Sequence, residues 1–295
     1  MIPATVPQAV LEARRGIGWM LVTMILFVSM DTVAKHLTAL YPVTQVVWAR
    51  FVFHTLLIGI LLAPRARLTM VTRRPGLQFL RSTLLLATTI LFFSGLRILP
   101  MAESAAMMQV GPLVITALSV PLLGELVGIR RWMGVIAGFA GALLIIRPGS
   151  EAMQIAILLP LAAAVSNALY QITTRILSRS ESTMTILFYT PLTGALLMSA
   201  AVPLFWVTPD AEGWAMMALL GLIGGVSHFT LIKAFTAAPA ATVAPFGYSS
   251  LIWATLSGLV FFGDFPDRWT IIGALVIAGS GLYILHREHV RKRSD

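Results

Sequence analysis

The chain repeats its own pattern at a distance of 139 residues, and this repeat constrains the fold more than any other feature. Residues of the same or similar type that coincide under this shift are Thr44 and Thr183, Pro100 and Pro239, Ala105 and Ala244, Gly124-Glu125 and Gly263-Asp264, and Gly134 and Gly273. Each copy holds five apolar stretches. Because five is odd, a second copy would enter a membrane from the opposite side to the first. Inverted repeats of this kind are typical of alternating-access carriers, whose site lies between the copies near the middle of the bilayer.

Composition places the whole chain in a membrane. Hydrophobic residues make up 58% of the sequence and charged residues only 11%, against about 25% charged in an ordinary soluble domain. Stretches of about 20 apolar residues cross a hydrocarbon core of about 30 Å as helices. We therefore predict an all-α integral membrane protein of ten transmembrane helices in two inverted five-helix repeats, residues 1–148 and 149–295. The predicted spans are 17–38, 44–63, 78–98, 101–122, 131–147, 154–175, 184–206, 213–236, 240–262 and 268–286.

The formal net charge of +9 comes from basic residues whose positions indicate the orientation of the chain in the membrane rather than a nucleic-acid partner. Most Lys and Arg residues, Arg81 among them, fall at or near one face of the predicted bundle, and such residues mark the cytoplasmic side of a membrane protein. Both termini are therefore expected in the cytoplasm, with the protein in a plasma membrane, the inner membrane if the cell is bacterial. Cys is absent, so neither a disulfide nor thiol chemistry is possible, and no spacing of ligands predicts a metal or a cofactor.

Among the ionisable residues inside the predicted spans, the first candidates for a functional role are Asp31, Arg50, His54, Glu103 and His228. A charge at the bilayer centre costs about 2.5 kcal/mol or more, so such residues are kept when they are paired, hydrated or functional. Asp31 and Arg50 lie at similar depth on successive helices, which makes a salt bridge plausible, with Lys35 as a competing partner for Asp31. The alternatives to a substrate site are charge neutralisation for this pair, interhelical hydrogen bonds for the two histidines, and a favourable helix dipole for Glu103.

Uncharged polar residues within the spans complete the candidate site: Gln109, Asn167, Tyr170, Gln171, Tyr248, Ser249 and Trp253. Trp253 stands out because helical rise places it near mid-depth, whereas tryptophans of membrane proteins usually lie at the interfaces. Kinked helices at matching places in both copies would indicate the site. Pro112 and Pro245 do not coincide under the 139-residue shift, so the sequence supports such a pair only in part.

The sequence resembles the EamA-type repeat of the drug/metabolite transporter superfamily. The resemblance is carried by Met101-Ala102-Glu103-Ser104-Ala105-Ala106, Pro112, Leu123-Gly124-Glu125, Gly134 and Gly141-Ala142-Leu143, and by the second run from Ala238 to Ala244 with Gly263-Asp264 and Gly273. It implies a ten-helix secondary-active carrier that exports amino acids. The alternative is an importer or facilitator of another small solute, such as riboflavin, S-adenosylmethionine or a nucleotide derivative.

Other classes of protein fit less well. No motif of an intramembrane protease, a zinc enzyme or an ATP-driven pump occurs, so we do not expect an enzyme. A channel-like pore or a membrane scaffold stays open at this point. The expected partners are a small-molecule substrate and the lipid bilayer, and the expected state is a monomer or weak dimer. Glycines spaced four apart, such as Gly134 and Gly138, favour close helix packing within one chain or across a dimer.

Overall fold

The structure, a computed structural model, describes residues 8–62, 71–124, 127–149, 155–178 and 180–294. Ten stretches within these ranges are long and apolar enough to cross a membrane, and they coincide closely with the ten predicted spans. The first five spans are formed by α1 (Gln8–Leu40), α2 (Val43–Leu62), α4 (Pro75–Ile98), α5 (Met101–Met108) followed by α6 (Gly111–Leu123), and α7 (Ile129–Ile146). The other five are formed by η2 (Ile155–Ile157) and α8 (Leu158–Leu177); α9 (Thr183–Ala201) and η3 (Val202–Phe205); α10 (Ala211–Ala237); α11 (Ala240–Val243), η4 (Ala244–Ser249), α12 (Ser250–Ser257) and η5 (Gly258–Phe262); and α13 (Arg268–Ser294).

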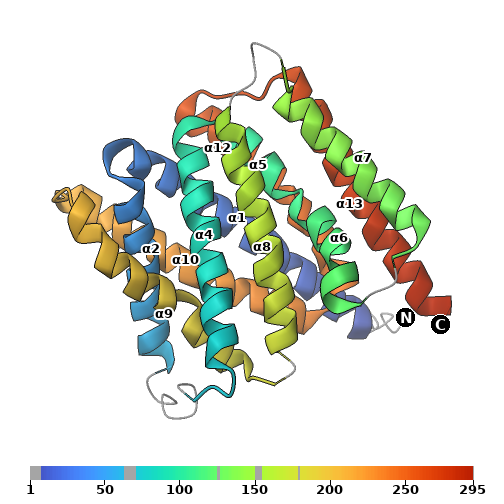
Figure 1. Cartoon of the computed structure of the whole chain (residues 1–295), viewed down its shortest axis with the longest axis horizontal. Coiled ribbons are helices and arrows are strands. Elements are labelled where there is room, and N and C mark those ends of the chain that lie inside the picture. Colours follow the sequence, from blue (N-terminus) through green and yellow to red (C-terminus); the bar gives the residue numbers. More distant parts are fainter. Residues whose placement is uncertain (1–7, 63–70, 125–126, 150–154, 179, 295) are drawn as a thin grey trace, which may run out of the picture.

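The packing of α7 against α13 shows that the two copies are inverted (Figure 1). A Cβ atom added to Gly134 would lie 2.8 Å from Ile284 Cγ1, and one added to Gly273 would lie 2.5 Å from Ile145 Cγ1. Since 134 + 139 = 273 and 145 + 139 = 284, these are one contact made twice, once by each copy. Residue numbers rise along α7 as they fall along α13, so equivalent helices run in opposite directions. The glycines spaced along α7 thus serve an intramolecular contact.

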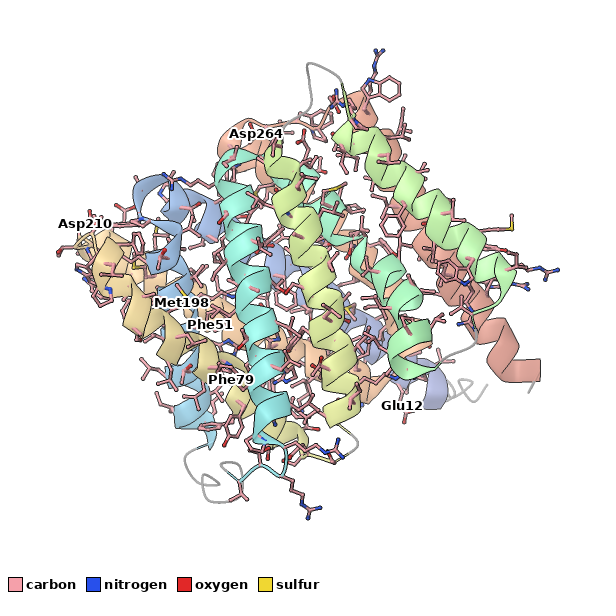
Figure 2. The ribbon with its side chains drawn as sticks, viewed as in Figure 1. Glu12, Phe51, Phe79, Met198, Asp210 and Asp264 are labelled. Carbon is pink, nitrogen blue, oxygen red and sulfur yellow. The ribbon has the colours of Figure 1, made fainter. Side chains whose placement is uncertain are left out.

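The same two-fold relation governs the interior of the bundle. The first span, α1, packs on α10, and its counterpart α8 packs on α4. Both pairs are antiparallel, and in each pair a hydroxyl group forms a hydrogen bond between the helices. Thr23 Oγ1 donates to Thr230 Oγ1 at 2.9 Å, and Ser166 Oγ donates to the carbonyl of Leu84 at 2.8 Å. Because the main partner of each helix comes from the other copy, the buried polar residues lie between the copies. Figure 2 shows Phe51 in this interior and the acidic Asp210 and Asp264 at the rim of the bundle.

The fourth and ninth spans are interrupted at equivalent places. α5 ends before Gln109, and η4 gives way to α12 at Ser249 and Ser250; the counterpart of Gln109 under the shift (109 + 139) is Tyr248. The two breaks touch, because Gln109 Nε2 donates to the carbonyl of Gly247 at 3.3 Å and to Ser250 Oγ at 3.2 Å. The two helix breaks therefore coincide under the 139-residue shift, although Pro112 and Pro245 do not. The proline positions had predicted such a matched pair of breaks only in part.

The turns that follow these two spans are also equivalent. Gly124 and Gly263 both take the left-handed conformation, with φ of 68° and 69°. Such a φ is strained for residues with a Cβ and readily adopted by glycine. Asp264 follows the second of these turns, whereas Glu125 lies outside the described residues.

Glycines of α10 allow α2 to approach closely. A Cβ added to Gly221 would meet Phe53 Cβ and lie 3.0 Å from the backbone nitrogen of His54 and 3.1 Å from the carbonyl oxygen of Arg50. Backbone atoms cannot give way without moving a helix. Small residues at a helix interface are the usual means of close packing in membranes, and here they hold the polar side of α2 against α10.

This contact yields a stability prediction. Gly221→Ala should lower the free energy of unfolding by about 1–3 kcal/mol, the usual cost of overpacking a well-packed interior. The check is the thermal unfolding of purified protein in detergent. Gly18→Ala is the matched control, since a Cβ there meets no atom within 4 Å and stability should not fall. Equal stability of both variants would show that α10 and α2 are not in close contact.

Candidate substrate site

Two basic side chains of α2 form the centre of the site. Arg50 and His54 lie one helical turn apart, on the face that α10 covers. Arg50 Nη1 donates to Thr89 Oγ1 of α4, and its guanidinium lies 5.5 Å from the ring centroids of both Phe51 and Phe93. The side chain is 7% exposed. Stacking on aromatic rings stabilises a cation that has little water around it, so this environment can retain a buried guanidinium.

The two candidate histidines, His54 and His228, meet across the two copies. The rings of His54 and His228 are stacked, with centroids 5.4 Å apart and planes 20° from parallel. Phe27 of α1 packs edge-on against His228, also at 5.4 Å. In the described part of the chain, Nε2 of each histidine is buried without a hydrogen-bond partner. The pair therefore offers two nitrogen atoms to a ligand or to water.

Asp31 faces this centre from α1. It lies four residues after Phe27, hence on the same helix face, and its side chain is half-buried. Its charge and that of Arg50 act on each other. Among the described residues, however, Asp31 forms no ion pair. The predicted direct salt bridge with Arg50 is therefore absent, and the carboxylate is available.

Lys35, the competing partner, is turned away from Asp31. Its Nζ donates to the carbonyl oxygens of Leu96 at 3.2 Å and Leu99 at 2.6 Å, and lies 3.7 Å from Asp264 Oδ2. The last carbonyls of a helix lack intrahelical partners and attract cations. The end of α4 thus holds Lys35, and Asp264 is the carboxylate that contacts it.

Arg81 is a part of the interior that the sequence did not reveal. Its position near the start of a span predicted an interfacial charge, yet the side chain is fully buried. Its Nη2 donates to the carbonyl of Ile186 at 2.7 Å and to Thr190 Oγ1, and Nη1 donates to Thr174 Oγ1 at 3.4 Å. Its guanidinium lies 5.1 Å from the ring centroid of Tyr170. The signal that could have found it is the pair of hydroxyl residues Thr174 and Thr190 in the second copy, which supplies acceptors.

The polar residues predicted on α8 differ in how deeply they are buried. Tyr170 packs beside Arg81 and against the main buried cluster, and its charge interaction with Arg50 places it near the centre. Asn167 is half-buried, whereas Gln171 is exposed. Tyr170 thus joins the central group, and Asn167 and Gln171 form a polar edge on the same helix.

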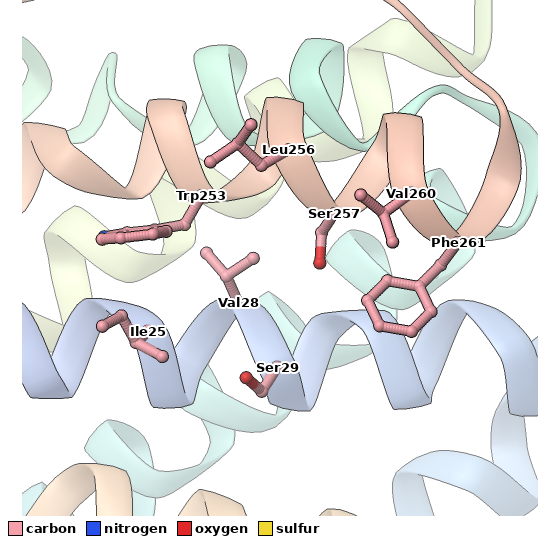
Figure 3. A pocket seen from close by; sticks show the side chains of 8 residues that line it. All are labelled: Ile25, Val28, Ser29, Trp253, Leu256, Ser257, Val260 and Phe261. Atoms are coloured by element: carbon pink, nitrogen blue, oxygen red, sulfur yellow. The ribbon is translucent and has the colours of Figure 1, made fainter.

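Trp253 lines a groove between the copies. The groove has a volume of about 210 Å³ and is lined by Ile25, Val28 and Ser29 of α1 and by Trp253, Leu256, Ser257, Val260 and Phe261. Figure 3 shows the indole of Trp253 above Ile25 and Val28, with Ser257 farther along. A hydrogen bond of 2.8 Å between Thr32 Oγ1 and Ser257 Oγ joins α1 to α12 near this groove. Trp253 Nε1 is buried with no hydrogen-bond partner in the described ranges.

Three other predicted residues belong to the helix breaks. Gln109 joins the two breaks, as described above. Ser249 Oγ donates to the carbonyl of Phe246 at 2.7 Å and so stays within its own turn. The hydroxyl of Tyr248 fills the space left by Gly281 of α13. The structure therefore places Tyr248 and Ser249 in the framework, away from the Asp31 and Arg50 group.

Glu103 lies at one end of the bundle rather than at its centre. The charges acting on it come from Asp267, Arg147, Asp264 and Lys35. Asp267 Oδ1 accepts the backbone N–H of Thr270 at 2.8 Å, and Asp267 Oδ2 pairs with Arg147. Burial opposes its ionisation, but the hydrogen bonds from Thr270 and Arg147 outweigh it and hold the pKa of Asp267 below its usual range.

A pH-dependent stability follows at this position. A carboxyl group whose pKa is lower in the folded than in the unfolded state stabilises the folded protein. This stabilisation is fully present above the unfolded-state pKa and is lost as the pH falls through the folded-state pKa. Asp267→Ala should therefore destabilise the protein at pH 7, by about 1 kcal/mol for a lost helix cap. The difference in unfolding temperature between variant and wild type should shrink as the pH falls below about 4. A difference that is constant or grows toward low pH would contradict this assignment.

Taken together, these features define a class. Ten membrane-spanning helices in two inverted copies, with paired helix breaks and a buried polar group between the copies, are the architecture of a secondary transporter. The sequence pattern of the EamA-like transporter family matches the chain twice, at residues 14–147 and 154–285. The protein is thus a member of the EamA-like transporter family.

Relatives within this family have different named substrates. An S-adenosylmethionine uptake transporter of Rickettsia bellii is 29% identical over 273 residues, which cover 92% of this chain and 94% of the relative. A riboflavin transporter of Rhizobium johnstonii is 29% identical, covering 97% and 96%. A pseudopaline exporter of Pseudomonas aeruginosa is 24% identical, covering 85% and 89%. One solved crystal structure shares the fold, with a TM-score of 0.64 at 23% identity, over 94% of this chain and 98% of the other.

Proposed function

We propose that this transporter carries a zwitterionic metabolite bearing an aromatic ring, with S-adenosylmethionine as the leading candidate. The observation that carries the proposal is Asp31, a carboxylate within a membrane span that faces the interior and has no ion-pair partner among the described residues. Such residues inside membrane spans mark substrate or ion paths. A sulfonium or ammonium group supplies the missing cation.

Aromatic side chains that pack against the same buried cluster support this choice of substrate. Phe27 lies one turn before Asp31 on α1, Tyr170 lies near Arg50, and Trp253 lines the groove beside α1. Aromatic rings attract cations over their faces and stack on planar rings. An adenine ring and a sulfonium cation would use both properties. The relatives named as S-adenosylmethionine uptake transporters support the same substrate.

Export of amino acids, which the family resemblance implied, is the weaker proposal. The named relatives favour the alternative of S-adenosylmethionine or riboflavin. Riboflavin is the second candidate, because its planar aromatic ring would stack on side chains such as Tyr170 and Trp253. It carries no cation, so Asp31 favours S-adenosylmethionine over riboflavin.

The test is uptake by purified protein in liposomes. Labelled S-adenosylmethionine should enter at a saturable rate, and unlabelled S-adenosylmethionine should compete more strongly than riboflavin or phenylalanine. An imposed pH gradient tests whether protons are coupled to transport. Uptake of riboflavin but not of S-adenosylmethionine would establish the second candidate in its place.

We further propose that both termini face the cytoplasm and that the two copies rock about the central site to expose it to each side in turn. The positions of Lys and Arg support the orientation, and the inverted copies support the rocking motion.

A further inference from the structure

Four buried nitrogen atoms of Arg and His side chains around the site lack hydrogen-bond partners in the described part of the chain. They are Arg50 Nε, Arg81 Nε, His54 Nε2 and His228 Nε2. The two guanidinium nitrogens always carry a proton, and a histidine Nε2 donates when the ring proton is placed there. Buried polar groups are nearly always hydrogen-bonded, so an orphaned group calls for an explanation such as an absent ligand. With the ring protons at Nε2, all four atoms are donors and require an acceptor.

These side chains surround one region rather than four. Arg50 Nε lies 4.0 Å from the position that a Cβ of Gly224 would occupy, and His54 Cδ2 lies 3.2 Å from that of Gly225. His54 stacks on His228, and the charges of both Arg50 and Arg81 act on His228. α2, α4 and α10 therefore bring the four nitrogen atoms to one side of the interior.

The charge of this region is unbalanced. The region holds two guanidinium groups, those of Arg50 and Arg81, and the carboxylate of Asp31 acts on the first of them. Neither guanidinium forms an ion pair with any described residue. Their hydrogen bonds go to hydroxyl and carbonyl oxygens, namely those of Thr89, Thr190, Thr174 and Ile186. Buried charges are ordinarily paired. A second negative charge would complete the group.

We infer that this region is the subsite for the carboxylate of the substrate, with Arg50 as the contacting residue and the two histidines as neutral donors beside it. The inference rests on the proposed function in that it assigns one part of a zwitterionic substrate to one part of the site. Asp31 then holds the cationic end and Arg50 the anionic end. Arg81 is a positioning residue: it is fully enclosed by α9 and Tyr170, and it adds positive potential behind the subsite.

Competition between two substrates tests the subsite if S-adenosylmethionine is transported. The decarboxylated analogue keeps the sulfonium, the amine and the adenosine but lacks the carboxylate. In the wild type it should compete about tenfold or more weakly, since charge-assisted hydrogen bonds to a carboxylate are the strong ones. In Arg50→Gln the two compounds should compete equally. A wild type that does not distinguish them, or a variant that still does, overturns the subsite.

A second arm needs no transport and separates this inference from the proposed function. Purified wild type is unfolded thermally in detergent while sodium acetate replaces sodium chloride at constant ionic strength. Acetate should raise the unfolding temperature saturably. Arg50→Gln should abolish the rise, and Arg97→Gln, at an exposed position near the end of α4, should retain it. If S-adenosylmethionine is not carried, an Arg50-dependent effect of acetate still supports the carboxylate subsite.

A variant that preserves the charge guards against misfolding of Arg50→Gln. Thr89→Val removes the hydroxyl that Arg50 Nη1 contacts and leaves the guanidinium in place. It should shift the midpoint of the acetate titration to higher concentration without abolishing the response. Equal effects of acetate and chloride in the wild type, or an unchanged acetate midpoint in Thr89→Val, would overturn the inference.

Discussion

Replacement of Asp31 by asparagine is expected to lower transport by about 30- to 150-fold, which corresponds to a loss of about 2–3 kcal/mol for a charge-assisted contact in a buried site. The amide keeps the size of the side chain but removes the charge that the substrate cation requires. The folded protein should survive, because Asp31 makes no ion pair with the described residues and its loss strands no partner at hydrogen-bond distance.

The measurement is initial uptake in proteoliposomes together with the unfolding temperature of the same preparation. Asp210→Asn is the matched control: Asp210 caps α10 by accepting the N–H of Gly213 at 2.7 Å, and asparagine serves as well as aspartate in that role. Transport by this control should be normal. Normal uptake by Asp31→Asn as well would remove Asp31 from the site and with it the main support for a cationic substrate.

A disulfide between positions 32 and 257 should stop transport completely and reversibly. Thr32 Oγ1 and Ser257 Oγ lie 2.8 Å apart, which brings two cysteine sulfurs within reach of bonding distance. α1 belongs to the first copy and α12 to the second, so the bond would tie the two copies together beside the groove. If the copies must move apart to expose the site, a covalent tie at this place holds them in one state.

The natural absence of cysteine makes this experiment simple, because Thr32→Cys and Ser257→Cys supply the only thiols. Oxidation of the double variant should abolish uptake and reduction should restore it. Each single variant should be insensitive to oxidant. Full transport by the oxidised, cross-linked protein would indicate a route that needs no relative motion of α1 and α12, as in a channel-like pore.

The spans and their inversion could be predicted because hydropathy alone decides which segments enter a membrane. The ten predicted spans agree with the ten observed to within a few residues at most ends. The equivalent contacts of Gly134 and Gly273 follow from the repeat that the sequence displays. Longer first and last helices, Gln8–Leu40 and Arg268–Ser294, were not predicted, since their polar ends leave the hydrophobic region.

Details that depend on contacts between the copies could not be predicted. Arg81 sits near a span end in sequence, and only the packing of α4 against α8 and α9 shows that it is enclosed. The matched helix breaks touch through the contact of Gln109 with Gly247 and Ser250, and the positions of the two prolines do not show this contact. Tyr248 was predicted at the site from its depth, but depth does not tell which neighbour a side chain meets, and Tyr248 meets α13.

The partners of Asp31 illustrate the same point. Sequence spacing offered Lys35 at one helical turn and Arg50 at equal depth. The structure gives Lys35 to the end of α4 and leaves Arg50 within electrostatic range without direct contact. Spacing along one helix cannot show that free carbonyl groups from another helix will compete for a cation. The sequence therefore indicated the three charged residues to compare, but not their contacts.

The central claim is that a single polar site between two inverted copies opens to each side of the membrane in turn. Asn167 is half-buried on the polar edge of α8, and Asn167→Cys would carry the only thiol in the chain. We expect an impermeant thiol reagent to modify it from either side, in right-side-out and in inside-out vesicles, with substrate slowing both reactions. Modification from only one side of the membrane, both with and without substrate, would contradict the account.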